Sequence, residues 1–294
     1  MSLIPVYRPR PSALHAARAG AGACFCCALA VTGALYRHPL VLAATVAAVV
    51  GAGVAAGVGR EIRRSLTLAL PLALLVTLVN PLVYAGGETL LIRGGTVLGR
   101  RIDITLESLA YGALSGLRVV AIIVALGLLS AAVDPDELLR LFRRVSYRSA
   151  LTASLANRLV PVLARDAARM SDAARCRPEP LGRLAVARAA VSGALDRSVD
   201  VAAALEVRGY SLGGRPPRRR RAWSRHDLRV AAAAAGILAV AVAGAAAGVG
   251  AVDPYPTLEI AWGPSEWALS AAIMLLALSP FAGRAARLGI GAGR

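Results

Sequence analysis

The sequence contains no lysine, so all 34 of its basic residues are arginines. A P-loop of the Walker A type needs a lysine on the nucleotide phosphates. Schiff-base catalysis needs the same side chain as its nucleophile. We therefore expect the chain neither to hydrolyse nucleotide by the P-loop route nor to form a lysine imine with a substrate.

Histidine and cysteine are also scarce. The three histidines are scattered and show neither metal-site spacing nor a paired carboxylate. Three of the four cysteines lie within one apolar run and the fourth stands alone, which gives no disulfide or metal framework. These residues are His15, His38, His226, Cys24, Cys26, Cys27 and Cys176. We expect no catalytic, cofactor-binding or metal site in this chain.

Apolar residues, in contrast, are abundant. They make up 57% of the 294 residues, whereas soluble domains contain about 45–50%. Crossing a bilayer takes about 20 consecutive apolar residues. Four clear segments (39–59, 66–84, 111–131 and 229–252) and two shorter or weaker ones (20–36 and 265–283) predict six membrane spans.

The first of these segments has a second interpretation as a secretory signal. Arg8, Arg10 and Arg18 precede an apolar region that contains Ala28-Leu29-Ala30, a pattern that signal peptides share. Five further hydrophobic segments favour a retained span.

The distribution of arginines predicts the orientation, because cytoplasmic loops are enriched in them. With the N-terminus inside, the outer loops hold only Arg37, Arg93, Arg100 and Arg101. The segment 132–227 alone holds nineteen arginines. We expect a multi-pass protein of the cell membrane whose N-terminus, 132–227 insert and C-terminus are cytoplasmic.

Carboxylates are missing from the middle of every predicted span. Carriers driven by protons or sodium usually place one there, so a self-sufficient secondary transporter is disfavoured. Arg118 is the one charge well inside a span. It either extends to the outer interface, the simpler expectation, or binds a structural partner.

The insert contains three amphipathic helix patterns. Asp134-Pro135-Asp136-Glu137 is a strong helix start. A second helix is expected over 152–175, with Leu155, Leu159, Val162, Leu163 and Met170 on its apolar side. A third is expected over 181–207, with an apolar stripe of Val191, Leu195, Val199, Ala202 and Leu205, and with Gly209 as a left-handed cap. The run Arg218–Arg221 is interpreted as an anchor beside anionic lipid.

Two further motifs precede the insert. Asn80-Pro81-Leu82-Val83-Tyr84, followed by Gly87 and Thr89-Leu90, and Leu106 to Gly112, followed by Gly116-Leu117-Arg118, lie around the fourth span. With the insert that follows, they resemble the transmembrane T component of energy-coupling factor transporters, which is related to the cobalt-uptake permease subunit. The similarity covers roughly residues 80–210.

That resemblance implies a docking role for two triplets. In the family, two coupling helices end in Ala-Arg-Gly motifs that dock onto a pair of ABC-type ATPase subunits. Ala174-Arg175-Cys176 stands at the first position, with cysteine in place of glycine, and Val207-Arg208-Gly209 at the second, with valine in place of alanine. The resemblance also implies a separate substrate-binding S component that captures a vitamin or transition-metal ion.

The sequence thus predicts an all-α polytopic membrane protein in three segments: a bundle of about four spans (1–131), a cytoplasmic coupling-helix region (132–227) and about two further spans (228–294). A stand-alone channel or facilitator is the alternative, although it leaves the insert unexplained. An enzyme of the membrane is disfavoured by the missing catalytic groups. Nucleic-acid binding is disfavoured because the insert has few aromatic residues and is tethered to a membrane.

Overall fold

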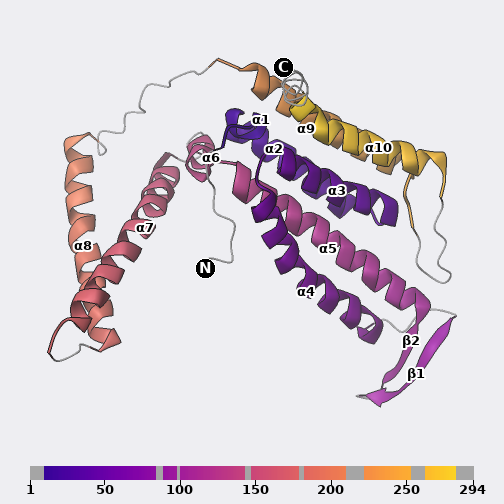
Figure 1. The fold of residues 1–294 in the computed structure, drawn as a ribbon, viewed down its shortest axis with the longest axis horizontal. Coiled ribbons are helices and arrows are strands. Elements are labelled where there is room, and N and C mark those ends of the chain that lie inside the picture. The colour runs from indigo at the N-terminus through magenta and orange to yellow at the C-terminus, as the bar shows by residue number, and fades with distance from the viewer. Residues whose placement is uncertain are drawn as a thin grey trace, which may run out of the picture. The chain divides into compact units, whose positions relative to one another are not determined.

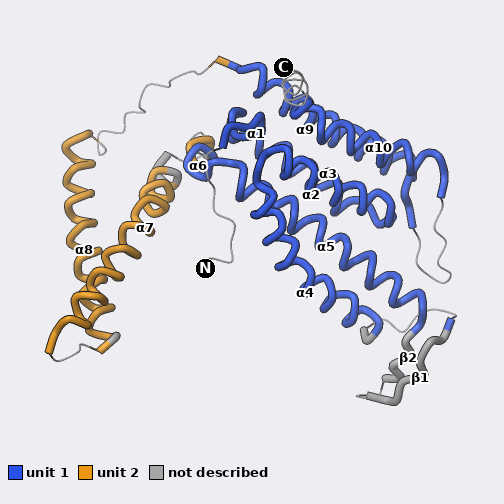
Figure 2. Tube along the Cα trace, in the orientation of Figure 1, with its two compact units in different colours: residues 1–138, 223–294 blue, residues 139–222 orange. Residues whose placement is uncertain are grey.

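The structure is a computed structural model that describes residues 10–83, 89–97, 100–142, 147–178, 182–209, 222–252 and 262–282. It divides into two compact units (Figure 2): unit 1 comprises residues 1–138 and 223–294, and unit 2 comprises residues 139–222. The predicted segment limits at 132 and 227 lie near these boundaries and remain a prediction about which parts meet the membrane.

Unit 1 is a helical bundle (Figure 1). Helix α2 packs against α5 and α9, and α3 packs against α5 and α10. The core is formed by fully buried apolar side chains from these five helices, among them Phe25, Leu29, Val49, Leu128, Ile237 and Ile273. Its elements are α1 (Ala13–Ala16), α2 (Ala19–Leu35), α3 (Pro39–Ala55), α4 (Gly59–Val83), β1 (Leu90–Val97), β2 (Arg100–Thr105), α5 (Leu106–Ala132), α9 (Arg225–Ala246), α10 (Pro264–Leu278) and the 3₁₀ helix η2 (Ser279–Phe281).

The prediction of a helical multi-pass membrane protein is confirmed. Among the described residues, four helical stretches are long and apolar enough to cross a bilayer: Gly59–Pro81, Leu106–Ala132, Arg225–Ala246 and Pro264–Phe281. Helices α2 and α3 are equally apolar but have 17 residues each, or about 26 Å at 1.5 Å per residue. That length is at the lower end of what a span requires.

The predicted limits of the second and third spans need correction. The apolar run 39–59 does not form one helix, because α3 ends at Ala55 and Gly57 takes a left-handed conformation with φ +80°. The Gly57 N–H donates to the Val54 carbonyl and the Val58 N–H to the Gly53 carbonyl, a pairing that terminates helices. Helix α4 then begins at Gly59, so Arg60 lies in its first turn.

Helix α4 continues through Pro81 to Val83, although a proline inside a helix usually kinks or ends it. A proline cannot donate to the carbonyl four residues before it, here that of Thr77. That carbonyl faces α5, where a Cβ on Gly112 would lie 2.6 Å from the Thr77 oxygen. The neighbouring helix therefore covers the carbonyl that the proline releases.

Small residues keep α4 and α5 in close contact along much of their length. A Cβ added to Gly116 would lie 2.6 Å from the Thr77 hydroxyl oxygen, and one added to Gly127 would lie 2.1 Å from that of Ser65. The Thr77 hydroxyl also donates to the Gly112 carbonyl over 3.2 Å. Small residues at such positions let helix backbones approach closely in membranes.

A β-hairpin precedes α5. Strands β1 and β2 pair antiparallel, with Leu90 opposite Thr105 and Arg93 opposite Asp103. The hairpin leads directly into α5, whose first turn is closed by a capping box between Thr105 and Ser108. This two-stranded element is an addition to a predominantly helical fold.

Arg118 has a structural partner. Its Nη2 atom donates to the Tyr36 carbonyl over 2.9 Å, and Tyr36 is the residue that closes the C-terminal end of α2. The Tyr36 hydroxyl in turn donates to the Ala241 carbonyl of α9 over 2.7 Å. Of the two interpretations, the structural partner is confirmed, and extension to the outer interface stays a prediction.

The N-terminal segment is fastened to the bundle by two ion pairs. Arg10 Nη2 lies 2.9 Å from Glu61 Oε1 of α4. The Arg18 backbone N–H donates to Asp227 Oδ1 over 2.6 Å, and the Arg18 guanidinium lies 5.3 Å from the centre of the Trp223 ring. Asp227 has no exposed side-chain area and also accepts from the Ser224 N–H in the cap of α9. Residues 10–18 thus hold the start of α9 in place.

Candidate functional site

Unit 2 and the chain leading into it are built from three helices, α6 (Pro135–Phe142), α7 (Tyr147–Arg175) and α8 (Arg183–Val207). The predicted start of α6 is confirmed: Asp134 Oδ1 accepts the Asp136 N–H over 2.9 Å. The predicted second and third helices are confirmed as α7 and α8, and α7 runs through Pro161. Residues Arg218–Arg221, the expected lipid anchor, lie outside the described residues.

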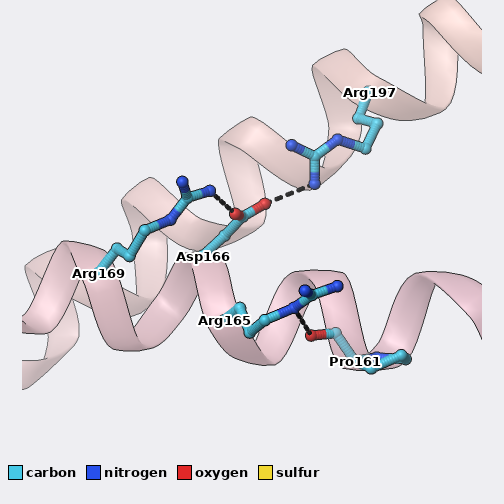
Figure 3. Close-up of polar contacts among 5 residues, drawn as sticks. All are labelled: Pro161, Arg165, Asp166, Arg169 and Arg197. Atoms are coloured by element: carbon cyan, nitrogen blue, oxygen red, sulfur yellow. Dashed lines mark hydrogen bonds and ion pairs between the residues drawn. The ribbon is translucent and has the colours of Figure 1, made fainter.

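Asp166 joins α7 to α8 (Figure 3). Arg197 Nη1 lies 2.5 Å from Asp166 Oδ2, and Arg169, one turn further along α7, donates to Oδ1. These bonds from Arg197 and Arg169 lower the pKa of the Asp166 carboxyl below its usual range. An ionised carboxylate at this point therefore fixes the register of the two helices.

The first predicted docking triplet ends α7. Ala174 is buried, whereas Arg175 and Cys176 are exposed. Arg175 Nη1 lies 3.9 Å from Asp172 Oδ1, and both side chains are more than 70% exposed. A pair at that distance and exposure contributes little stability. The Arg175 guanidinium is thus available to another protein.

The second triplet ends α8. Gly209 has φ +77°, and its N–H donates to the Glu206 carbonyl over 2.9 Å, which confirms the predicted left-handed cap. Val207 is 90% exposed, an unusual state for a β-branched apolar side chain. Within the part of the chain that the structure describes, the Arg208 side chain makes no hydrogen bond or ion pair.

Arg208 lies beside a basic groove that the sequence analysis missed. The groove has a volume of about 540 Å³ and is lined by Arg140, Leu151, Ser154, Leu155, Arg158, Leu205 and Arg208. Three arginines and three leucines thus line the same groove. The helical spacing of 151, 155 and 158 places these α7 residues on one face, a signal that was present in the sequence. Nothing in the sequence pairs that face with Arg140 or Arg208.

Arg175 and Arg208 lie at opposite ends of the helix pair. Arg208 borders the groove beside residues 151–158, whereas Arg175 is the last residue of α7. Residues 158 and 175 are about 25 Å apart along the helix, at 1.5 Å per residue. In Figure 1, α7 and α8 approach each other near the turn that joins them and separate toward the Val207 end of α8. One small partner surface cannot contact both arginines at once.

The predicted apolar stripe of α8 lies on an exposed face of that helix. Val191, Leu195 and Val199 of the expected stripe are exposed by 59–67%, and Leu184 extends the same face. Small residues face α7 instead: Ala190, Gly193 and Ala194 line a cavity with Leu163, Asp166, Arg169, Met170 and Arg197. The apolar stripe therefore remains available, since α8 packs on α7 through its alanines and glycine.

Residues 12–218 match the cobalt transport protein family, CbiQ. The chain belongs to this family. No curated protein sequence matches it.

Membership of the cobalt transport protein family makes the chain a membrane component of a transport system, in agreement with its apolar helices. The match extends from the N-terminal segment through α8 and therefore includes both arginine-ended helices. Among the described residues, no group of three or more His, Cys, Asp or Glu side chains is placed to hold a metal ion.

Proposed function

We propose that this protein is the transmembrane coupling subunit of an energy-coupling factor importer. Two ABC-type ATPase subunits bind its helix ends, one at Ala174-Arg175-Cys176 and one at Val207-Arg208-Gly209. The observation that carries the proposal is the position of Arg175 and Arg208. Each is exposed at the C-terminal end of a long helix, and the two lie at opposite ends of the pair.

Arginine suits such a contact because its planar guanidinium donates paired hydrogen bonds to carboxylates and backbone oxygens. In this mechanism the ATPases close on ATP and reopen after hydrolysis. Their movement displaces the ends of α7 and α8. The ion pair between Asp166 and Arg197 keeps these helices in register, so displacement of one end moves both helices together.

The exposed face of α8 provides a platform for a second partner. An apolar face of four side chains on a helix otherwise packed through alanines marks a protein or membrane contact. We assign it to a separate substrate-binding S component, which supplies the recognition of a vitamin or transition-metal ion. The family to which the chain belongs favours cobalt as that ion. The chain itself contributes no catalytic step.

The arginine distribution supports an orientation with the N-terminus, the insert and the C-terminus in the cytoplasm. This places α7 and α8 on the side where ATP is available. The basic side chains near the membrane would also contact the headgroups of anionic lipids.

The proposal is tested by replacing Arg175 and Arg208 with glutamate, singly and together, and measuring recovery of the ATPases with the protein in mild detergent. Truncation of one partner of an interfacial charge pair costs about 2–5 kcal/mol, so we expect each single variant to lose more than tenfold in affinity. Arg165→Glu, an exposed arginine near the middle of α7 that belongs to neither triplet, is the matched control. Normal ATPase recovery and uptake in the double variant would refute the docking assignment, and a partner set without a P-loop ATPase would favour a stand-alone channel.

A further inference from the structure

Helices α7 and α8 leave a pocket between them, toward the Arg175 end of the pair. The pocket has a volume of about 270 Å³, whereas a cavity of about 150 Å³ already holds benzene. Its α7 wall reaches Met170, which precedes Arg175 by about 7.5 Å along the helix at 1.5 Å per residue. The lining residues are Leu163, Asp166, Arg169, Met170, Ala190, Gly193, Ala194 and Arg197. The pocket is thus large enough for a side chain and lies beside a proposed docking point.

One carboxylate holds two guanidinium groups at this pocket (Figure 3). Arg197 Nη1 lies 2.5 Å from Asp166 Oδ2, and Arg169 donates to Oδ1 of the same side chain. Among the described residues, neither arginine forms a further ion pair. Each guanidinium has five N–H donors, and both side chains are partly exposed, by 79% for Arg169 and 39% for Arg197. One aspartate against two arginines therefore leaves positive charge and unused donors beside the pocket.

Gly193 contributes to the volume of the pocket. It lies in the interior of α8, where glycine destabilises a helix relative to alanine. Packing against α7 does not require glycine here, because among the described residues a Cβ at this position would meet only Met170 Cε within 4 Å, at 3.7 Å. Ala190 and Ala194 on the same wall are also small and half-buried. The space that these side chains leave is thus available to a group from outside the helix pair.

We propose that the pocket receives an acidic side chain of the ATPase subunit that binds at Ala174-Arg175-Cys176. The identity of this partner rests on the proposed function. The entering carboxylate pairs with Arg169 and Arg197, since guanidinium groups bind carboxylates through paired hydrogen bonds. Its methylene groups contact the apolar part of the wall. A side chain held in this way touches α7 and α8 together, so movement of the ATPase is transmitted to both helices at this level as well as at the end of α7.

Occupancy of the pocket is tested with single cysteines at two adjacent positions of α8. Gly193→Cys places a thiol in the pocket, and Ser192→Cys places one at an exposed position that does not line it. The full-length protein in mild detergent is treated with a maleimide, alone and with the purified ATPase pair bound. The tryptic peptide 189–197, which contains no natural cysteine, is then quantified by mass spectrometry. We expect labelling of Gly193→Cys to be lost in the complex and labelling of Ser192→Cys to remain.

The charge of the pocket is tested with a matched pair of substitutions on α7. Arg169→Gln removes one guanidinium and leaves Asp166 paired with Arg197. Arg165→Gln removes the same charge from an exposed position one turn earlier that does not line the pocket. We expect Arg169→Gln to bind the ATPases about two- to fivefold more weakly at low salt, as for other partly exposed charge pairs, and to regain wild-type affinity at high salt. Arg165→Gln should bind as the wild type does.

The pocket contact and the docking assignment can fail separately. Continued labelling of Gly193→Cys in the complex, protection of both cysteines, slow labelling of Gly193→Cys without the ATPases, or equal affinities of Arg169→Gln and Arg165→Gln would each overturn the pocket contact. The docking assignment is decided by Arg175→Glu. Loss of ATPase binding in that variant, together with any of these results, would refute the pocket and leave the proposed function in place.

Discussion

Arg197 on α8 donates to Asp166 on α7 across 2.5 Å, and this bond links two helices whose C-terminal ends carry the proposed docking arginines. Residue 166 is 31 positions before residue 197. The ion pair joins the two helices near the middle of each.

Asp166→Asn should weaken the pairing of α7 and α8, because the neutral amide cannot replace a carboxylate that accepts from both Arg197 and Arg169. We expect unit 2 to open more readily, which hydrogen exchange in the intact protein measures as faster exchange of the amides of α7 and α8. Asp172→Asn is the control, since the Asp172 pair with Arg175 is long and exposed. Equal destabilisation by both substitutions would contradict a specific role for Asp166.

The same pair predicts a pH dependence. The pKa of Asp166 is lower in the folded protein than in the unfolded chain. In the unfolded chain the pKa of an aspartate is about 3.9. The stabilisation is therefore fully present above that unfolded pKa and is lost as the pH falls through the folded pKa. We expect exchange protection of α7 and α8 to decrease below about pH 4, and this decrease to be smaller in Asp166→Asn. An identical acid profile in the variant would show that other groups are responsible.

Gly112→Ala should separate α4 from α5, because the added Cβ would lie 2.6 Å from the Thr77 carbonyl oxygen. Overpacking against a backbone atom costs about 1–3 kcal/mol, which a thermal unfolding assay in detergent can resolve. Gly182→Ala provides the comparison: a Cβ there meets nothing within 4 Å, and its φ of −61° suits alanine. A Gly112→Ala protein as stable as wild type would show that the two helices do not approach as closely as described.

Arg140→Gln should weaken the ATPase contact at the Arg208 end while leaving the Arg175 end unchanged. Arg140 borders the same groove as Arg208, so its charge adds to the attraction for an acidic partner surface. Exposed charge pairs are worth about 0.2–1 kcal/mol, and we expect a two- to fivefold loss in ATPase affinity that disappears at high salt. An unchanged affinity at low salt would remove Arg140 from the docking surface without affecting the assignment of Arg208.

Cys176 offers a direct measurement of orientation. It is exposed, as are Cys24 and Cys27, while Cys26 is buried. In a variant with Cys24 and Cys27 replaced by serine, we expect a membrane-impermeant maleimide to label Cys176 in inside-out vesicles and not in intact cells. Labelling in intact cells would reverse the proposed topology and place α7 on the side without ATP.

The elements that the sequence predicted correctly are those determined by neighbouring residues. The aspartate cap of α6 and the glycine cap of α8 depend on side chains within a few positions of the helix end. The ends of α7 at Arg175 and of α8 at Val207 were predicted from the same local signals. These features can be predicted without knowledge of contacts between distant residues.

The features that the sequence did not predict depend on contacts between residues far apart in the chain. Helix α4 passes through Pro81, and the carbonyl that this proline releases faces Gly112 of α5. Arg118 is fixed by a carbonyl 82 residues earlier. The basic groove needs Arg140, Arg158 and Arg208 to come together from three helices. Hydrophobic periodicity describes each helix separately and contains none of these pairings.

The attachment of Arg18 to Asp227 and Trp223 has a practical consequence for engineering this protein. Residues 18 and 227 lie 209 positions apart in the chain, yet their contact fixes the point at which the polypeptide returns from unit 2 to unit 1. Unit 1 is therefore held together by a contact that joins the chain before residue 139 to the chain after residue 222. Under the proposed function, the segment 139–222 is an exchangeable cassette through which ATPase preference can be transplanted between relatives without rebuilding unit 1.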